Sequence, residues 1–180
     1  HLPAAHAAGY GTAIINGGSA DRVHLRKSAS ASAASLGLYF TGTEVLCESD
    51  PDKQWVKITI GSQTGYMKSE FLYRGNNPAS VPSKQPTGTV KSTGAWVNLR
   101  QSPSLNASAA GKLYNGDTVT VLGETVTEWY YVMIGSQYGY VLADYLSVGN
   151  AAPPSAYGTA KVNGGSADRV HLRKSASASA

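Results

Sequence analysis

Short runs of alternating hydrophobic and polar residues recur along this chain. In residues 55–60, Val56, Ile58 and Ile60 fall on one face and the residues between them on the other. A period of two predicts a β-strand with one buried face. The same alternation is found in residues 23–26, 45–47, 97–100, 119–121 and 129–134.

Turn residues separate these runs. Gly-Ser-Gln follows Ile60 and again Ile134, and Thr-Gly and Asn-Gly precede the two middle runs. Such residues favour tight turns between antiparallel strands. The chain has no helical pattern, and about five short strands in about 60 residues are typical of a small all-β barrel. We therefore predict an all-β fold.

The chain repeats itself at two levels. Residues 11–33 recur as residues 158–180 with two differences, at positions 14 and 15. A more diverged repeat appears at an offset of 74 residues, where residues 22–72 lie over 96–146 without a gap. At this offset "WVKITIGSQTGYM" falls on "WYYVMIGSQYGYV". The pattern predicts two complete units and the first third of another.

The composition of the segments between the repeats predicts where the units end. Residues 74–87 and 147–157 are rich in Pro, Asn, Ser and Ala and are typical of linkers. We expect an N-terminal tail at 1–10, units at 11–73 and 88–146, and a partial unit at 158–180.

The second unit carries five short motifs in a characteristic order: "VNLRQSPS", "GDTVTVLG", "EWYYV", "GSQYGYV" and "DYL". In this order they resemble the bacterial SH3-like domain, SH3b. The first unit is similar but departs from the pattern, with His24 for the usual Asn and Ala29 for the Pro at 103. The resemblance implies two small SH3-like β-barrels in tandem, followed by the N-terminal strand segment of a truncated third repeat.

This resemblance also implies a function and a location. SH3b domains usually occur in exported or wall-associated bacterial proteins, where they target a catalytic domain to the wall. We expect a secreted or cell-wall-associated module of a larger protein, such as a wall hydrolase. Its implied ligand is a peptidoglycan stem peptide or cross-bridge.

Charge and hydropathy exclude other partners. The net charge is +4, but residues 11–73 carry six basic and six acidic side chains, and residues 88–146 carry three and four. Nearly neutral units do not predict nucleic-acid binding. No run of 18 apolar residues predicts a membrane span.

The residues needed for catalysis are missing from the pattern. Cys47, the single cysteine, lies on the inward face of a strand, as expected of a buried small hydrophobe. The four histidines do not form a metal-ligand set, and the acidic run 48–52 lies at a turn. We predict no catalytic residues, no metal and no cofactor, so any catalytic domain would lie outside this chain.

Aromatic residues are the best candidates for binding. Trp55 and Trp129 occupy equivalent positions on the strand face opposite the aliphatic core, Trp129 together with Tyr131 and Met133. Either a loop covers these tryptophans or they form a flat platform for a peptide or sugar. Tyr66 and Tyr140 follow the glycine of the last hairpin, where we expect them to border the same groove.

Polar residues precede the long loop of each unit. The candidates are Asn98, Arg100 and Ser102 in the second unit and His24 and Arg26 in the first. Each arginine could hold the loop or contact a ligand.

Two functions follow from these features. The first is a non-catalytic module that binds the bacterial cell wall, in which two weak sites gain by effective concentration. The alternative is a structural spacer or a protein–protein interaction repeat array. Residues 158–180 duplicate a first strand, so they predict self-association by strand exchange, within or between chains, or by pairing along a free strand edge. Alternatively, they are only the first part of a further unit in a longer array.

Overall fold

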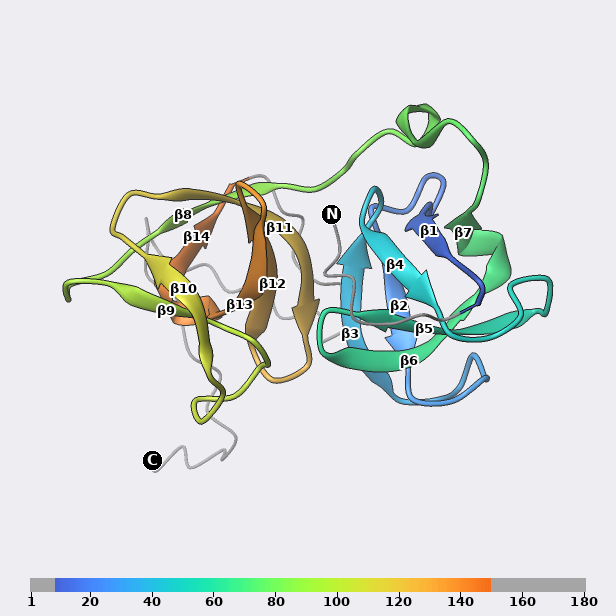
Figure 1. Cartoon of the computed structure of the whole chain (residues 1–180), viewed down its shortest axis with the longest axis horizontal. Coiled ribbons are helices and arrows are strands. Elements are labelled where there is room, and N and C mark those ends of the chain that lie inside the picture. The colour runs from blue at the N-terminus through green and yellow to red at the C-terminus, as the bar shows by residue number, and fades with distance from the viewer. Residues whose placement is uncertain (1–8, 150–180) are drawn as a thin grey trace, which may run out of the picture.

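Fourteen antiparallel strands form the protein in the computed structural model, which describes residues 9–149 (Figure 1). The predictions for the partial repeat, its self-association and the N-terminal tail up to residue 8 lie outside the described residues. We call the part from β1 to β7 the N-terminal half and the part from β8 to β14 the C-terminal half. The prediction of an all-β fold is confirmed.

The two halves have corresponding elements. The N-terminal half contains β1 (Thr12–Ile15), β2 (Arg22–Arg26), β3 (Ser35–Phe40), β4 (Glu44–Cys47), β5 (Trp55–Ile60), β6 (Gln63–Lys68), the 3-10 turn η1 (Ser69–Phe71) and β7 (Leu72–Tyr73). The 3-10 turn η2 (Pro78–Ser80) follows. The C-terminal half contains β8 (Thr87–Val90), β9 (Val97–Arg100), β10 (Ala109–Leu113), β11 (Thr118–Thr125), β12 (Trp129–Ile134), β13 (Gln137–Leu142), η3 (Ala143–Tyr145) and β14 (Leu146–Val148).

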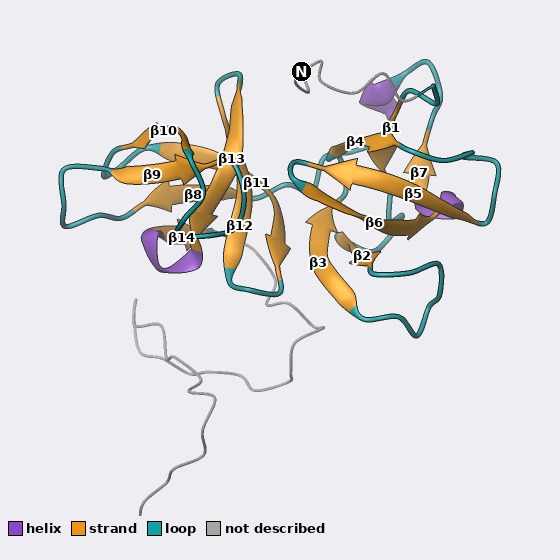
Figure 2. Ribbon diagram, turned by 60° about the horizontal axis from the view of Figure 1, so that its bottom comes forward, coloured by secondary structure: helices purple, strands orange, loops and turns teal. Residues whose placement is uncertain are grey.

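Strand pairing is also the same in the two halves. In the N-terminal half the order is β3-β2-β6-β5-β4-β1-β7, and in the C-terminal half β10-β9-β13-β12-β11 continues through β8 to β14. Each half is thus a curled antiparallel sheet around its own core, consistent with an SH3-like fold. Figure 2 shows these two curled sheets beside each other.

The predicted inward faces form these cores. Val56, Ile58 and Ile60 are fully buried, and so is Cys47 at the end of β4. Val45 and Val121 are likewise buried in the cores of their halves. Alternation identified these positions because in a half-buried strand only every second side chain faces the core.

One pair of strands joins the halves into a continuous sheet. The C-terminal end of β11 pairs with β3, with Gly123 opposite Tyr39 and Thr125 opposite Gly37. β11 reaches this far because residues 122–125 stay extended, whereas in the N-terminal half β4 ends at Cys47 and the equivalent residues, 48–51, lead into a turn that begins at Pro51. The two halves are therefore joined by strand pairing as well as by the chain between them.

The junction, where β11 of the C-terminal half pairs with β3 of the N-terminal half, covers the outer face of β12. Strand alternation predicts Trp129, Tyr131 and Met133 on the face away from the aliphatic core, but all three pack in or against the core cluster of the N-terminal half. In β5 the residue equivalent to Tyr131 is Lys57, which is exposed. The prediction of a half-exposed strand was wrong for β12 because the neighbouring half covers its outer face.

The predicted linker 74–87 also packs on the N-terminal half. Val81 is buried, and the backbone N–H of Lys84 donates to the carbonyl oxygen of Thr41 at 3.0 Å. The Lys84 ammonium lies 3.0 Å from the carboxylate of Asp21. In Figure 1 this segment arches from β7 to β8.

Candidate functional site

Each half contains a surface cavity beside a tryptophan. The C-terminal cavity has a volume of about 350 Å³ and the N-terminal cavity about 270 Å³. Residues of the C-terminal cavity are Ser92, Thr93, Gly94, Trp96, Val97, Asn98, Arg100, Leu105, Trp129, Leu142 and Tyr145. Residues of the N-terminal cavity are Ala20, Arg22, Val23, His24, Arg26, Ala31, Trp55, Lys68 and Phe71.

The two cavities occupy equivalent places in the repeat. Adding 74 to the number of each residue of the N-terminal cavity gives a residue of the C-terminal cavity, without exception. Only Ser92 and Thr93 are additional in the C-terminal cavity. The offset comes from the sequence and the linings come from the geometry, so their agreement shows that the repeat preserves the cavity as well as the core.

Strand alternation brings the polar residues to this surface. In β9, Val97 and Leu99 point into the core, so Asn98 and Arg100 face the other way. His24 and Arg26 are placed in the same way by β2. Because β9 continues directly into the long loop at 101–108, its polar face and that loop border the same cavity.

The arginines hold the loops. The Nη1 group of Arg100 donates to the carbonyl oxygen of Ala107 at 2.7 Å, and that of Arg26 donates to the carbonyl oxygen of Ala33 at 2.8 Å. These equivalent bonds close the loop over the strand in both halves. Both guanidinium groups also line a cavity, so they shape the surface on which a ligand would lie.

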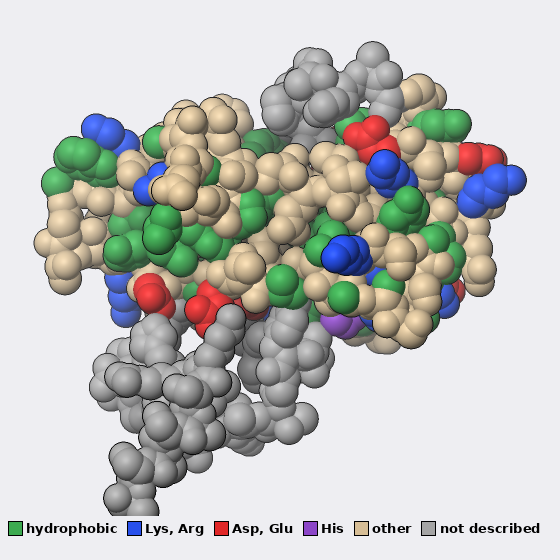
Figure 3. All heavy atoms as spheres, turned by 90° about the horizontal axis from the view of Figure 1, so that it is seen from below, with side chains coloured by type: hydrophobic (Ala, Val, Ile, Leu, Met, Phe, Trp, Pro, Cys, Tyr) green, Lys and Arg blue, Asp and Glu red, His purple; other side chains and the backbone are tan. Residues whose placement is uncertain are grey.

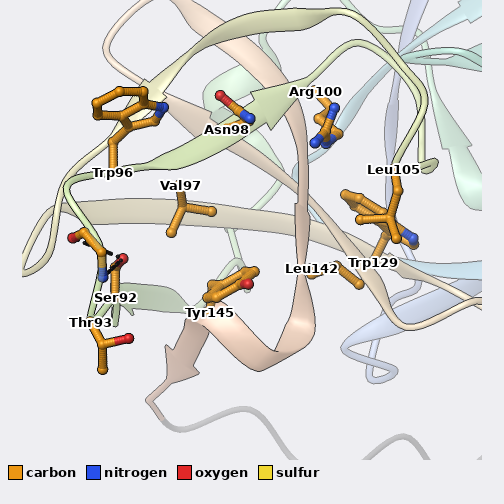
Figure 4. A pocket seen from close by; sticks show the side chains of 11 residues that line it. Ser92, Thr93, Trp96, Val97, Asn98, Arg100, Leu105, Trp129, Leu142 and Tyr145 are labelled. Atoms are coloured by element: carbon orange, nitrogen blue, oxygen red, sulfur yellow. Dashed lines mark hydrogen bonds between the residues drawn. The ribbon is translucent and has the colours of Figure 1, made fainter.

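Aromatic side chains form the ends of the C-terminal cavity. Figure 4 shows Trp96 at one end and Trp129 with Leu105 at the other, with Asn98 and Arg100 on β9. Trp96 is 46% exposed, whereas Trp129 is 5% exposed. The Lys112 ammonium lies 3.8 Å from the centroid of the Trp96 ring, a cation–π contact that holds this indole.

Six of the nine paired positions differ, and three of these exchanges change the chemical class of the side chain. Arg22 replaces Trp96, His24 replaces Asn98 and Lys68 replaces Leu142. The N-terminal cavity is therefore more basic and the C-terminal cavity more aromatic. Figure 3 shows hydrophobic side chains gathered on one face of the C-terminal half, at the left.

His24 is uncharged at neutral pH in this setting. Burial lowers the pKa of the imidazole, and the positive charges of Arg26 and Arg22 lower it further. Its Nδ1 atom lies 2.9 Å from the hydroxyl of Ser35.

Six of the nine predicted site residues line the cavities: Trp55, His24 and Arg26 in the N-terminal cavity and Trp129, Asn98 and Arg100 in the C-terminal cavity. Tyr140, Tyr66 and Ser102 do not line them. Tyr140 is fully buried at the junction of the halves, where it packs against Tyr131 at 4.9 Å between ring centroids. Its predicted place at the groove was wrong, because β13 turns this side chain toward the N-terminal half.

Several lining residues were not predicted. Trp96, Leu105, Leu142 and Tyr145 line the C-terminal cavity, and Arg22 and Lys68 line the N-terminal one. They lie on loops, at strand ends or in the 3-10 turns, where a period of two gives no signal. Comparison of paired positions would have drawn attention to Arg22 and Trp96, since an aromatic replaces a cation there.

Metal ligands and the single cysteine are two kinds of group that could support catalysis. Within residues 9–149 no three His, Cys, Asp or Glu side chains are placed to hold a metal ion. Cys47 is buried, and burial raises the pKa of its thiol, which keeps it protonated. No helix among these residues has the length and apolar character needed to cross a membrane.

Curated proteins match part of the chain. A protein of Bacillus subtilis with the name "Putative N-acetylmuramoyl-L-alanine amidase YrvJ" is 34% identical over 103 residues, which is 54% of this chain and 20% of that protein. "Bacteriocin BCN5" of Clostridium perfringens is 30% identical over 74 residues, 41% of this chain and 8% of its own length. The chain therefore spans a fifth or less of these relatives.

Two solved structures match this chain in a structural comparison, NlpC2 and NlpC1 from Trichomonas vaginalis. Their sequence identities to it are 13% and 14%, and the TM-score is 0.37 for each. Their alignments cover 76% of this chain and 47% and 45% of the respective structures.

The five sequence motifs of the C-terminal half all lie within the residues that a family model matches. The family model for the bacterial SH3 domain matches residues 94–147, which contain β9 to β13, η3 and most of the C-terminal cavity. Residues 94–147 of this chain therefore belong to the bacterial SH3 domain family.

Proposed function

We propose that this chain is a non-catalytic module that binds the bacterial cell wall. In this proposal residues 11–73 and 88–146 are two SH3-like domains, and each contributes one binding site. The ligand is a stem peptide or cross-bridge of peptidoglycan, and the module belongs to a larger exported protein. A catalytic domain, where one exists, lies elsewhere in that protein.

The observation that carries the proposal is the equivalence of the two cavities. Residues in a structural repeat diverge freely unless packing or function restrains them. Here the equivalent positions retain a tryptophan on β5 or β12, an aromatic ring on η1 or η3, and an arginine that holds the loop. Aromatic walls with a few polar groups are typical of peptide and sugar sites.

The relatives support the same proposal. Residues 94–147 match a bacterial domain family, and the Bacillus subtilis relative is a bacterial protein. The name of that relative specifies an amidase of a cell-wall component. The match covers 20% of that protein, so most of it lies outside the part that this chain matches. A binding role for the matched part is consistent with this division.

Binding to insoluble peptidoglycan tests the proposal. The chain should sediment with purified peptidoglycan, and Trp96→Ala together with Trp55→Ala should abolish most of this binding. Trp96 suits the test because it is 46% exposed, whereas replacing the buried Trp129 would disturb the core. Tyr114→Ala is a matched control, since Tyr114 is 53% exposed and lies outside both cavities.

Thermal denaturation of each variant separates lost binding from lost folding. If the unchanged chain does not sediment with peptidoglycan, the alternative of a structural spacer or interaction repeat is favoured. The burial of Trp129 and the sheet that joins the halves are the observations in favour of that alternative.

A further inference from the structure

The N-terminal cavity is distinguished by its positive charge. Arg22, Arg26 and Lys68 line it, together with His24. In the C-terminal cavity Arg100 is the one charged residue of the lining. Neither lining contains Asp or Glu among the described residues. The repeat has therefore placed two additional permanent cations around one of two otherwise equivalent cavities.

We propose that the N-terminal cavity binds a carboxylate of a short acidic peptide, whereas the C-terminal cavity binds an uncharged stretch of peptide. The inference rests on the proposed function, in which both cavities are peptide sites. It adds that the two sites differ in the part of the ligand that they recognise.

The additional cations occupy defined positions. Arg22 begins β2, and its guanidinium carbon lies 5.4 Å from the centroid of the Phe40 ring, which orients the side chain. Lys68 ends β6, which pairs with β2 where Arg26 lies opposite Tyr66. An arginine recognises a carboxylate through two parallel hydrogen bonds, and a lysine contributes a point charge.

Nearby acidic groups weaken the positive electrostatic potential of the N-terminal cavity only in part. The Lys68 ammonium lies 3.1 Å from the carboxylate of Glu70, and both side chains are substantially exposed. Asp21, next to Arg22 in the chain, is paired with Lys84. Exposed ion pairs of this kind are worth little, so a ligand carboxylate can replace Glu70 at small cost.

The remaining walls favour a peptide over a phosphate polymer. The lining also contains four apolar or aromatic residues, Val23, Ala31, Trp55 and Phe71. Apolar and aromatic walls gain from contact with alkyl side chains or a peptide plane. A polyol phosphate offers charge but no apolar group, so it would leave these walls without a partner.

Nuclear magnetic resonance of the indole N–H groups can test the two sites separately. The chain has three tryptophans, of which Trp55 reports on the N-terminal cavity and Trp96 and Trp129 on the C-terminal cavity. The probes are acetyl-Ala-Glu-Ala-Ala with a free carboxyl terminus and the uncharged acetyl-Ala-Gln-Ala-Ala amide. The acidic peptide should bind at Trp55 at least about fivefold more tightly than the neutral one.

Substitutions at the paired positions sharpen the test. Arg22→Gln with Lys68→Leu should remove the preference for the acidic peptide at Trp55 and leave the response of Trp96 and Trp129 unchanged. Leu142→Lys should create a preference for the acidic peptide in the C-terminal cavity. Lys53→Gln is the control, because it removes a cation from a side chain that is 74% exposed and outside the cavity.

Three outcomes would overturn the inference. Equal affinity of the Trp55 site for both peptides would remove the charge preference while the proposed function stands. Binding of glycerol 3-phosphate at Trp55 as tightly as the acidic peptide would make the cavity a phosphate site. A lack of response at all three indoles, to both peptides and to soluble peptidoglycan fragments, would contradict the proposed function itself.

Discussion

The hydroxyl of Tyr140 donates a hydrogen bond to the carbonyl oxygen of Ile60 at 3.2 Å, across 80 residues of sequence. The same hydroxyl oxygen accepts a hydrogen bond from the backbone N–H of Ser62 at 3.1 Å. Tyr140 thus binds both sides of the turn between β5 and β6 and attaches the N-terminal half to the C-terminal half. Burial raises the pKa of this phenol above its usual value, so the hydroxyl keeps its proton and donates throughout the neutral range.

Removal of this hydroxyl should weaken the junction. Tyr140→Phe removes this partner from the buried carbonyl of Ile60 and from the partly buried N–H of Ser62, so we expect the free energy of unfolding to fall by about 1–2 kcal/mol. Urea denaturation followed by circular dichroism measures the change. Tyr66→Phe, at the equivalent position of the N-terminal half, should change stability by less than about 0.5 kcal/mol. Equal losses for the two variants would contradict the role assigned to Tyr140.

The turn that Tyr140 binds also contains a glycine with a matched control. Gly61 and Gly135 are equivalent and have φ values of +59° and +58°. A Cβ atom on Gly61 would lie 2.5 Å from the Tyr140 hydroxyl and 2.8 Å from the Tyr131 ring, whereas one on Gly135 would meet nothing within 4 Å. Replacement by alanine adds the same left-handed strain at both positions, so their difference reports the junction alone.

We expect Gly61→Ala to destabilise the protein by about 1–3 kcal/mol more than Gly135→Ala, because the buried Tyr140 ring cannot move aside. Parallel urea denaturation of the two variants measures this difference. Similar midpoints for both would show that the halves separate easily at this turn.

The strands and their inward faces were predictable, but their pairing between halves was not. Alternation located Val56, Ile58 and Ile60 in the core because each strand carries its own period. The pairing of β3 with β11 gives no periodic signal in the sequence, since the two strands belong to different halves of the chain. One signal was nevertheless present: at the position of the exposed Lys57, the second unit has Tyr131, and an aromatic in place of a surface lysine indicates a covered face.

The candidate site was predictable to a similar degree. The outward positions of β2 and β9 identified His24, Arg26, Asn98 and Arg100, because alternation sorts a strand into two faces. It could not distinguish Trp129, which lines a cavity, from Tyr140, which fills the junction. Both belong to outward faces, and the sheet curls so that one end of the outer face meets the other half.

The loop-holding role of Arg100 gives a prediction about dynamics. Arg100→Met retains the alkyl stem but removes the hydrogen bond to the carbonyl oxygen of Ala107. We expect faster amide hydrogen exchange in residues 101–108 and a loss of about 1 kcal/mol in the free energy of unfolding. Arg26→Met should do the same for the loop at 27–34. Unchanged exchange in both loops would mean that the loops hold their shape without the arginines.

His24 makes stability depend on pH in a direction that can be derived. Burial and the neighbouring arginines lower its pKa in the folded protein below the value of about 6.5 for an unfolded chain. Below about pH 6.5 the unfolded state therefore binds more protons, and the free energy of unfolding falls as the pH is lowered toward the folded-state pKa.

His24→Asn, which introduces the residue at the equivalent position 98, removes this contribution while keeping a polar side chain beside Ser35. The unfolding free energies of the two proteins, measured from pH 7.5 to pH 5, should converge or cross as the pH falls, because the unchanged protein alone loses the contribution of His24. The other histidines, at 1, 6 and 171, are present in both proteins and cancel in the comparison. A constant difference across this range would show that His24 titrates alike in the folded and unfolded chains, contrary to its position between Arg22 and Arg26.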